Sequence, residues 1–199
     1  MNQRHSRGRE REIDLTPTPS QTVGPYLHLG LTNTHSLSRV AGDGAKGERV
    51  WLTFRVLDGE GVPVPDAMIE LWQADSEGNY ERPEGSEDGA AFGGFGRLAT
   101  GEDGSCTFET IKPGCVPGSG ETVQAPHINV SILGRGILKR LSTRLYFAGE
   151  PANAADSVLA LVPEGRRPTL FAHPDPTRAD NWIFEVRLRG EAETVFFDV

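Results

Sequence analysis

VPVPDAMIELWQAD, residues 62–75, is the stretch of sequence that decides the fold. Two prolines stiffen its first half, and proline belongs in turns and strand edges because it has no backbone N–H to donate. Its second half, residues 67–73, is a mostly apolar run centred on Met68-Ile69-Glu70-Leu71-Trp72, which predicts a strand. Upstream, residues 50–57 alternate between apolar and polar side chains and predict a strand with one buried face. The turn sequence Asp58-Gly59-Glu60-Gly61 follows that upstream strand.

Glycine- and proline-containing turn sequences continue to the end of the chain. Glycine occurs 24 times and proline 14 times in 199 residues, which is typical of many short strands joined by turns. Further strands are predicted at residues 97–100, 105–110, 127–133, 141–147, 182–189 and 193–198. We expect 97–100 and 105–110 to form a hairpin, and residues 151–162 to be the one short helix. About eight strands without alternating helices predict an all-β fold, a two-sheet β-sandwich over residues 49–199 with little helix.

The first 48 residues have a different composition. Residues 1–15 are polar, lack the apolar core of a signal peptide, and are expected to be a disordered or poorly ordered tail. Residues 16–48 contain several prolines followed by a turn-like polar segment, so we expect an extended N-terminal arm and loop region on the surface. No apolar run approaches the roughly 20 residues of a membrane helix, and we therefore expect a cytoplasmic protein.

The charge and the cysteine content of the chain exclude some classes of function. The chain has 20 Lys and Arg against 28 Asp and Glu, a formal net charge of -8. Nucleic-acid binding needs clustered basic residues, so no nucleic-acid partner is expected, whereas an anionic small molecule needs only one or two cations. The two cysteines, Cys106 and Cys115, are too few for a disulfide framework and are expected to be free thiols in a reducing compartment.

No self-sufficient catalytic set is present in the sequence. There is no G-x-S-x-G elbow, no P-loop and no zinc-type cysteine and histidine spacing. Of the five histidines, only His127 lies in a strong strand pattern, and a lone strand histidine is more often structural than a ligand. From the residues alone, the chain is a β-domain whose function is open.

Several motifs, in a consistent order, resemble those of the intradiol ring-cleaving dioxygenases. Residues 62–75 resemble that family's hairpin and "E-x-W-Q-A" strand, and Thr110-Ile111-Lys112-Pro113-Gly114 resembles the loop before its metal site. Ala125-Pro126-His127-Ile128-Asn129 resembles its "P-A-H-I-H" strand, and residues 145–147 and 184–190 also fit. Together these segments cover most of the chain from residue 50 onward. The resemblance implies the family's β-sandwich and its ferric iron chemistry.

The family's iron ligands, two tyrosines and two histidines, are mostly missing here. The second histidine position is Asn129, the tyrosine position after Gly114 is Val116, and no tyrosine lies in residues 82–89; only His127 remains. Hard Fe(III) favours anionic phenolate oxygens, so this set should not hold it. The resemblance is therefore to non-catalytic α subunits, whose β partner binds Fe(III) in αβ protomers of a larger oligomer. The alternatives are a non-catalytic β-sandwich binding module and a self-sufficient dioxygenase with replacement ligands.

The resemblance also implies which residues of this chain line the shared pocket. They are Thr22, Gly24, Pro25 and Tyr26 of the arm, together with Arg135. The implied reaction cleaves 3,4-dihydroxybenzoate with O2 between its hydroxylated carbons to give 3-carboxy-cis,cis-muconate, a step of the β-ketoadipate pathway. A surface ion pair is an equal alternative for Arg135, and a purely structural strap is the alternative for the arm.

Overall fold

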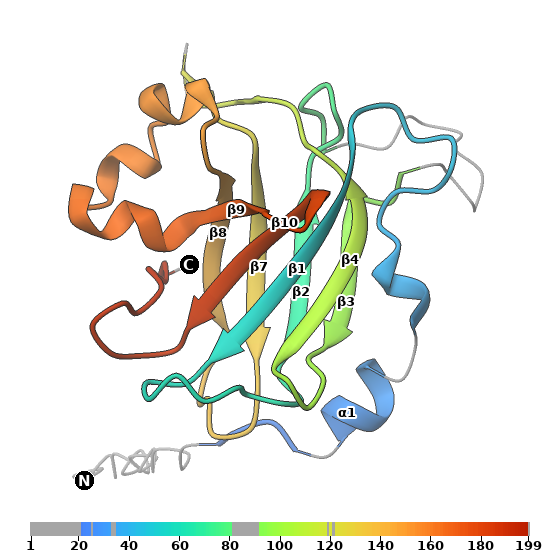
Figure 1. Ribbon diagram of the computed structural model, residues 1–199, viewed down its shortest axis with the longest axis vertical. Helices are drawn as coiled ribbons and strands as arrows, with labels where there is room; N and C mark the ends of the chain where they lie inside the picture. The colour runs from blue at the N-terminus through green and yellow to red at the C-terminus, as the bar shows by residue number, and fades with distance from the viewer. Residues whose placement is uncertain are drawn as a thin grey trace, which may run out of the picture.

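The computed structural model describes residues 21–24, 26–32, 35–80, 92–118, 120 and 122–198. Eight strands form two facing layers that are joined along one side (Figure 1). Their hydrogen-bonded order is β3-β2-β7-β8-β9-β10-β1-β4, with β9 making the connection between the layers. The bounds are β1 Arg49–Leu57, β2 Met68–Gln73, β3 Phe95–Ala99, β4 Ser105–Ile111, β7 His127–Leu133, β8 Leu141–Phe147, β9 Phe171–Asp175 and β10 Arg178–Arg187. The predicted two-sheet sandwich is confirmed.

The alternation of buried and more exposed side chains along each strand explains why the two layers pack against each other. In β1, Val50, Leu52, Phe54 and Val56 are buried and the residues between them are more exposed, as the sequence predicted. β1 runs antiparallel to β4 and parallel to β10, so these three strands form most of one layer, with β4 at its edge. Alternate side chains of a strand face the same side, so one face of each layer can be wholly apolar.

The core lies between the layers and is closed by aromatic contacts. The ring of Phe54 meets those of Phe108 and Phe184 edge to face, with centroids 5.6 and 5.8 Å apart. Edge-to-face pairs of this kind add about 0.5–1.5 kcal/mol beyond simple area burial. The opposite layer contributes apolar side chains from its own strands, including Ile69, Leu71, Leu98, Ile128, Val130, Ile132 and Leu145.

The predicted hairpin of residues 97–100 and 105–110 is wrong. β3 pairs with β2, and β4 pairs with β1. The turn at residues 101–104 therefore carries the chain from one layer to the other. Turn residues specify that the chain reverses, but the strand that each arm then joins depends on contacts far away in the sequence.

Helical structure also differs from the expectation. Residues 151–162 contain two short 3-10 turns, Pro151–Ala155 (η2) and Leu159–Leu161 (η3), and a third, η4, follows at Glu164–Leu170. The arm is not fully extended, because Tyr26–Leu31 form helix α1, and His35–Ser38 form the 3-10 turn η1. Short strands β5 (Val116–Pro117) and β6 (Val123–Gln124) pair with each other.

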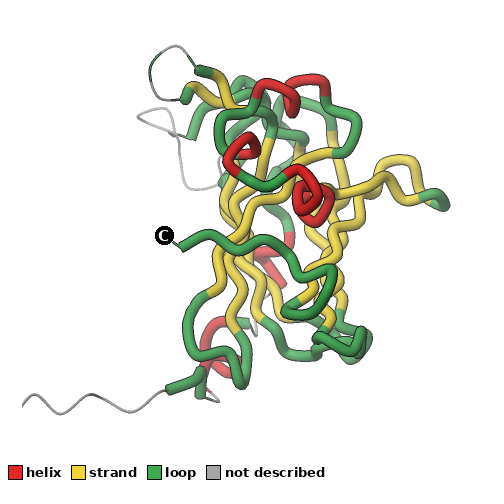
Figure 2. The backbone as a smooth tube through the Cα atoms, turned by 90° about the vertical axis from the view of Figure 1, so that its left-hand side faces the viewer, coloured by secondary structure: helices red, strands yellow, loops and turns green. Residues whose placement is uncertain are grey.

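The C-terminal part of the chain differs from the prediction in two places: it contains a strand that was not predicted, and a predicted strand is missing. β9 was missed, and Figure 2 shows the β9–β10 hairpin extending away from the sandwich. The expected strand at residues 193–198 is only an isolated bridge between Phe197 and Ser142. The predicted N-terminal tail, residues 1–15, lies outside the described residues. None of the described helices is long and apolar enough to cross a membrane.

Candidate functional site

Thr22 of the arm binds the loop between β7 and β8. The Thr22 hydroxyl accepts a hydrogen bond from the Gly136 N–H at 2.9 Å and donates to the Ile137 carbonyl at 3.2 Å. Gly136 has a φ of +83°, a left-handed conformation that glycine adopts without steric cost. The turn in the β7–β8 loop thus presents its backbone polar groups to the arm.

Arg135 lies in this same turn, next to the glycine that Thr22 contacts. Its guanidinium forms an ion pair with Asp66 at 3.0 Å, and the two side chains are 73% and 42% exposed. An exposed ion pair is worth only about 0–1 kcal/mol, so the guanidinium is held loosely. The arm residue Thr22 therefore contacts the turn that carries Arg135.

The other predicted arm residues are described only in part. The Gly24 carbonyl accepts the Leu27 N–H at 3.2 Å where helix α1 begins. Tyr26 is the first residue of that helix. Pro25 and the side chain of Tyr26 lie outside the described part of the chain.

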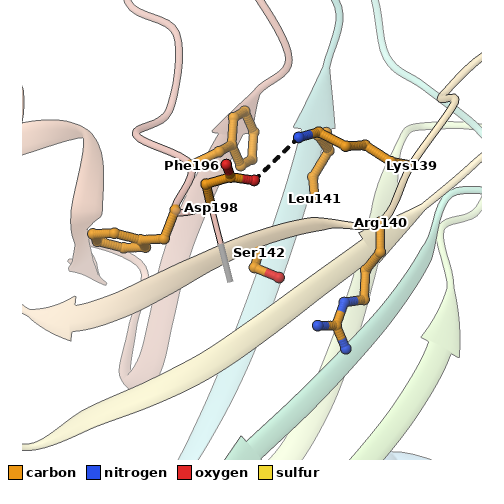
Figure 3. Close-up of a pocket in the computed structure, with 7 residues that line it drawn as sticks. Lys139, Arg140, Leu141, Ser142, Phe196 and Asp198 are labelled. Atoms are coloured by element: carbon orange, nitrogen blue, oxygen red, sulfur yellow. Dashed lines mark hydrogen bonds and ion pairs between the residues drawn. The ribbon is translucent and has the colours of Figure 1, made fainter.

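Two hollows lie on either side of the β7–β8 loop. The first, of about 240 Å³, lies between arm residues 21–23 and the β7–β8 loop. The second, of about 320 Å³, lies between that loop and the C-terminal segment, and Lys139 and Arg140 line both. Figure 3 shows Lys139 reaching Asp198, with which it forms an ion pair at 3.3 Å, while Arg140 extends in another direction. The loop thus carries three cations at the protein surface, Arg135, Lys139 and Arg140.

The family's metal positions lie elsewhere, on the outer face of the layer β3-β2-β7-β8. His127 is the first residue of β7, and Asn129 follows two positions later on the same face. The imidazole of His127 is buried and its Nδ1 lies 2.8 Å from the Ala125 carbonyl oxygen. Val116 is buried in β5 and has no side-chain donor or acceptor.

Tyr80, which the sequence motifs did not single out, completes this cluster. The Tyr80 hydroxyl lies 3.3 Å from His127 Nε2 and accepts a hydrogen bond from Asn129 Nδ2 at 3.1 Å. Its ring stacks on Trp72, with centroids 6.2 Å apart and an interplanar angle of 13°. Tyr80 is one of only three tyrosines, which is the sole signal that could have singled it out.

The electrostatics of this cluster favour neutral groups. Burial is the main cause that raises the pKa of the Tyr80 phenol, and burial also lowers the pKa of His127. Arg144 lies opposite Asn129 across β7 and β8 and further lowers the pKa of His127. Its guanidinium donates to Gln124 Oε1, an uncharged partner, at 2.7 Å.

These residues do not fit a ferric ion. Val116 offers no donor, Asn129 presents its amide N–H to Tyr80, and a guanidinium lies nearby. Hard Fe(III) favours several anionic oxygen ligands. Among the described residues, no group of three His, Cys, Asp or Glu side chains could hold a metal ion.

Below the cluster, a buried carboxylate fixes the strand that carries His127. Asp156 is 1% exposed, and its Oδ2 accepts the Ala125 N–H at 2.8 Å. Its Oδ1 accepts the Tyr146 hydroxyl at 3.1 Å and the Leu159 N–H at 2.7 Å. Buried carboxylates of this kind persist where they satisfy several donors at once.

Comparisons with known proteins show the family to which this chain belongs. The family model described as Dioxygenase matches residues 22–190. The chain is 45% identical over 198 residues to the protocatechuate 3,4-dioxygenase alpha chain of Burkholderia cepacia, covering 93% of this chain and 98% of that one. It is 35% identical over 158 residues to the beta chain of the same enzyme and organism, covering 74% of this chain and 67% of that one. The solved dioxygenase domain of a dioxygenase carbohydrate-binding protein fusion from Streptomyces sp. SirexAA-E is 27% identical with a TM-score of 0.60, covering 88% of this chain and 99% of that one.

Proposed function

The chain belongs to the intradiol dioxygenase family, and we propose that it is the α subunit of a protocatechuate 3,4-dioxygenase. One observation carries the proposal. The chain matches an α chain over 93% of its length, while the positions where the family holds its metal carry Val116 and Asn129. Fe(III) is then bound by the β partner, and this chain completes the pocket in an αβ protomer of a larger oligomer.

The arm and the β7–β8 loop are this chain's proposed contribution to the pocket. The hydrogen bonds of Thr22 to the Gly136 N–H and the Ile137 carbonyl hold the arm against the turn that carries Arg135. In the sequence of the arm, proline at position 25 restricts its own backbone and glycine at position 24 lets a ligand approach closely, and Tyr26 follows at the start of α1. The arm also excludes water from that side of the pocket, which strengthens electrostatic interactions within it.

Arg135 is the proposed partner of the substrate carboxylate. Its present partner, Asp66, is a carboxylate in an exposed pair, so a bound aromatic acid would replace one carboxylate by another. The loss of the exposed pair costs little, whereas a guanidinium can bind a carboxylate with two parallel hydrogen bonds. The proposed substrate, 3,4-dihydroxybenzoate, carries one such group, and its cleavage product belongs to the β-ketoadipate pathway. We also propose that the protein works in the cytoplasm, which the free thiols of Cys106 and Cys115 support.

Reconstitution tests the proposal. This chain and a candidate β chain are expressed separately and together, and iron content and protocatechuate-dependent oxygen uptake are measured for each. We expect iron and turnover in the complex, and neither in this chain alone. Stoichiometric iron and turnover in this chain alone would refute the α-subunit assignment. Failure of the two chains to associate would favour a binding module instead.

Arg135→Gln gives the sharper test, with Lys139→Gln as its matched control. Both are exposed cations of the β7–β8 loop, and each has an exposed carboxylate partner. In the reconstituted complex we expect Arg135→Gln to raise KM for protocatechuate at least tenfold, since a charged hydrogen bond contributes about 1.5–3 kcal/mol. Lys139→Gln should leave KM within about twofold. Equal effects of the two substitutions would show that Arg135 acts only through surface charge.

A further inference from the structure

Asp66 links three loops at the end of the sandwich where Thr22 binds. These loops connect β1 to β2, β3 to β4 and β7 to β8, and Figure 1 shows them at the same end of the molecule. Asp66 belongs to the first loop, its N–H donates to the carbonyl of Thr100 in the second at 3.1 Å, and its carboxylate accepts a hydrogen bond from Arg135 in the third at 3.0 Å. The surroundings of Arg135 therefore depend on Asp66.

The backbone of Asp66 has a conformation that side chains rarely adopt. Its φ is +58°, and every other residue with a positive φ in the described part of the chain is a glycine. Aspartate and asparagine tolerate this left-handed region better than most residues, but it still costs free energy. Such outliers persist only where the surrounding structure enforces them, and they cluster at ligand-binding sites.

A buried threonine enforces this conformation. The Thr100 hydroxyl donates to the Val64 carbonyl at 2.7 Å and accepts the Ala67 N–H at 3.0 Å. Its backbone N–H donates to the Ala67 carbonyl at 2.9 Å, and its carbonyl accepts the Asp66 N–H. Thr100 is only 3% exposed, so water competes little for these four hydrogen bonds. They fix the backbone from which the Asp66 carboxylate extends to Arg135.

The ion pair of Asp66 with Arg135 has the same chemistry as the proposed contact between Arg135 and a substrate carboxylate. Both join a guanidinium to a carboxylate, and a guanidinium binds such a group best when it is free to use two of its N–H donors. Asp66 is part of the same chain and its backbone is fixed, so its carboxylate is present at a high effective concentration. It can compete with a ligand even though the exposed pair itself is weak.

We propose that Asp66 is an internal competitor for Arg135, and that it determines how tightly carboxylated ligands bind. The substrate carboxylate displaces Asp66 from Arg135 on binding, and Asp66 returns to Arg135 as the product leaves. A ligand without a carboxylate does not need Arg135, so the competition does not affect its binding. This inference rests on the proposed function, because Arg135 has to face the shared pocket.

Asp66→Asn in the reconstituted complex tests the competition. Asparagine keeps the shape and tolerates a positive φ, but it cannot form an ion pair with Arg135. We expect KM for protocatechuate to fall about three- to tenfold, because Arg135 is released and a like charge beside the bound carboxylate is removed. The inhibition constant of catechol, which lacks the carboxylate, should change by less than about twofold.

The matched control is Asp58→Asn. It removes the same charge from the same loop, but the Asp58 carboxylate accepts the backbone N–H groups of Glu60 and Val62. Asp58→Asn should therefore leave KM for protocatechuate within about 1.5-fold of the unaltered complex. A fall in KM as large as that of Asp66→Asn would show that only the net charge of the loop matters, and would overturn the proposal.

Two further variants separate the carboxylate from the backbone and from the cation. Asp66→Gly accepts the positive φ without steric cost and should lower KM as much as Asp66→Asn does. With Arg135→Gln already present, Asp66→Asn should lower KM by less than about twofold, because no guanidinium is released. If Arg135→Gln alone leaves KM unchanged, the proposed role of Arg135 fails and the competition fails with it. If Arg135→Gln raises KM but neither Asp66 variant lowers it, only the competition is refuted.

Discussion

Replacement of Asp156 by alanine should be among the most destabilising single changes in this chain. The carboxylate is buried, and its oxygens accept hydrogen bonds from Ala125, Tyr146 and Leu159, all of which are themselves buried. A donor left unsatisfied in the interior costs about 1–3 kcal/mol. Water that enters the small space left by the side chain will satisfy part of this set. We therefore expect Asp156→Ala to lower the free energy of unfolding by about 3–5 kcal/mol.

Urea denaturation and thermal melting measure this loss. For a domain of this size, a decrease of 3–5 kcal/mol corresponds to a fall in Tm of about 6–20 °C. Asp156→Asn keeps the shape and one accepting oxygen, so it should lose roughly half as much. The matched control is Asp103→Ala, which removes an exposed carboxylate that binds Ser105 within one turn and should cost less than about 1 kcal/mol. If Asp156→Ala and Asp103→Ala unfold at the same urea concentration, the buried network does not stabilise the fold.

Three further outcomes are expected. Burial raises the pKa of the Cys106 thiol to about 12. At pH 8 a thiol reagent should therefore label the exposed Cys115 and leave Cys106 unmodified until the chain unfolds. Labelling of both thiols at equal rates in the folded chain would contradict this. Hydrogen bonds from Thr177 and Asn181 lower the pKa of Asp175 to about 2. Its stabilising contribution is therefore complete above pH 4 and lost as the pH falls toward 2, so Asp175→Asn should flatten the acid limb of the stability curve; an unchanged acid limb would count against it. Thr22→Val removes the hydrogen bonds between the arm and the β7–β8 loop. In the reconstituted complex it should raise KM for protocatechuate several-fold with little change in Tm. A fall in Tm without a change in KM would show that the arm has a purely structural role.

The strands that were predicted correctly are those whose burial pattern is visible locally. β7 and β8 have the predicted bounds, and β1 differs by one residue at its start. β9 was missed because Phe171–Asp175 contains a proline and does not alternate, and only two of its residues pair with β8. The predicted C-terminal strand failed for the opposite reason, since residues 193–198 look like a strand but have no neighbouring strand along most of their length.

The helix prediction failed through capping and proline chemistry. Pro151 begins the first 3-10 turn, and Asp156 ends it by taking the extended conformation while its carboxylate accepts the N–H groups of Val158 and Leu159. Aspartate often competes with the helix backbone in this way. A periodicity argument does not count such side-chain bonds, so it joins two short turns into one helix.

The loss of metal-ligand residues at the candidate site could be predicted from the sequence, but the residue that now contacts His127 and Asn129 could not. The loss of the family's ligand residues at Val116 and Asn129 follows from the motifs that resemble the family. The role of Tyr80 does not, because its contacts with His127 and Asn129 span 47 and 49 positions in the chain. The meeting of Thr22 with the Arg135 turn was anticipated only through family resemblance, since no local pattern links an arm to a distant loop.

The two polar regions of this chain should respond to substitution in opposite ways. The Tyr80 cluster is internally satisfied, so changes there should alter stability and leave the KM of a reconstituted enzyme nearly unchanged. The Thr22 and Arg135 region is exposed and loosely held, so changes there should alter KM and leave stability nearly unchanged. A variant of either region that moved both quantities together would mean that the sheet face and the arm are coupled. Measurement of Tm and KM on the same variants therefore separates what holds this fold together from what the fold contributes to a shared active site.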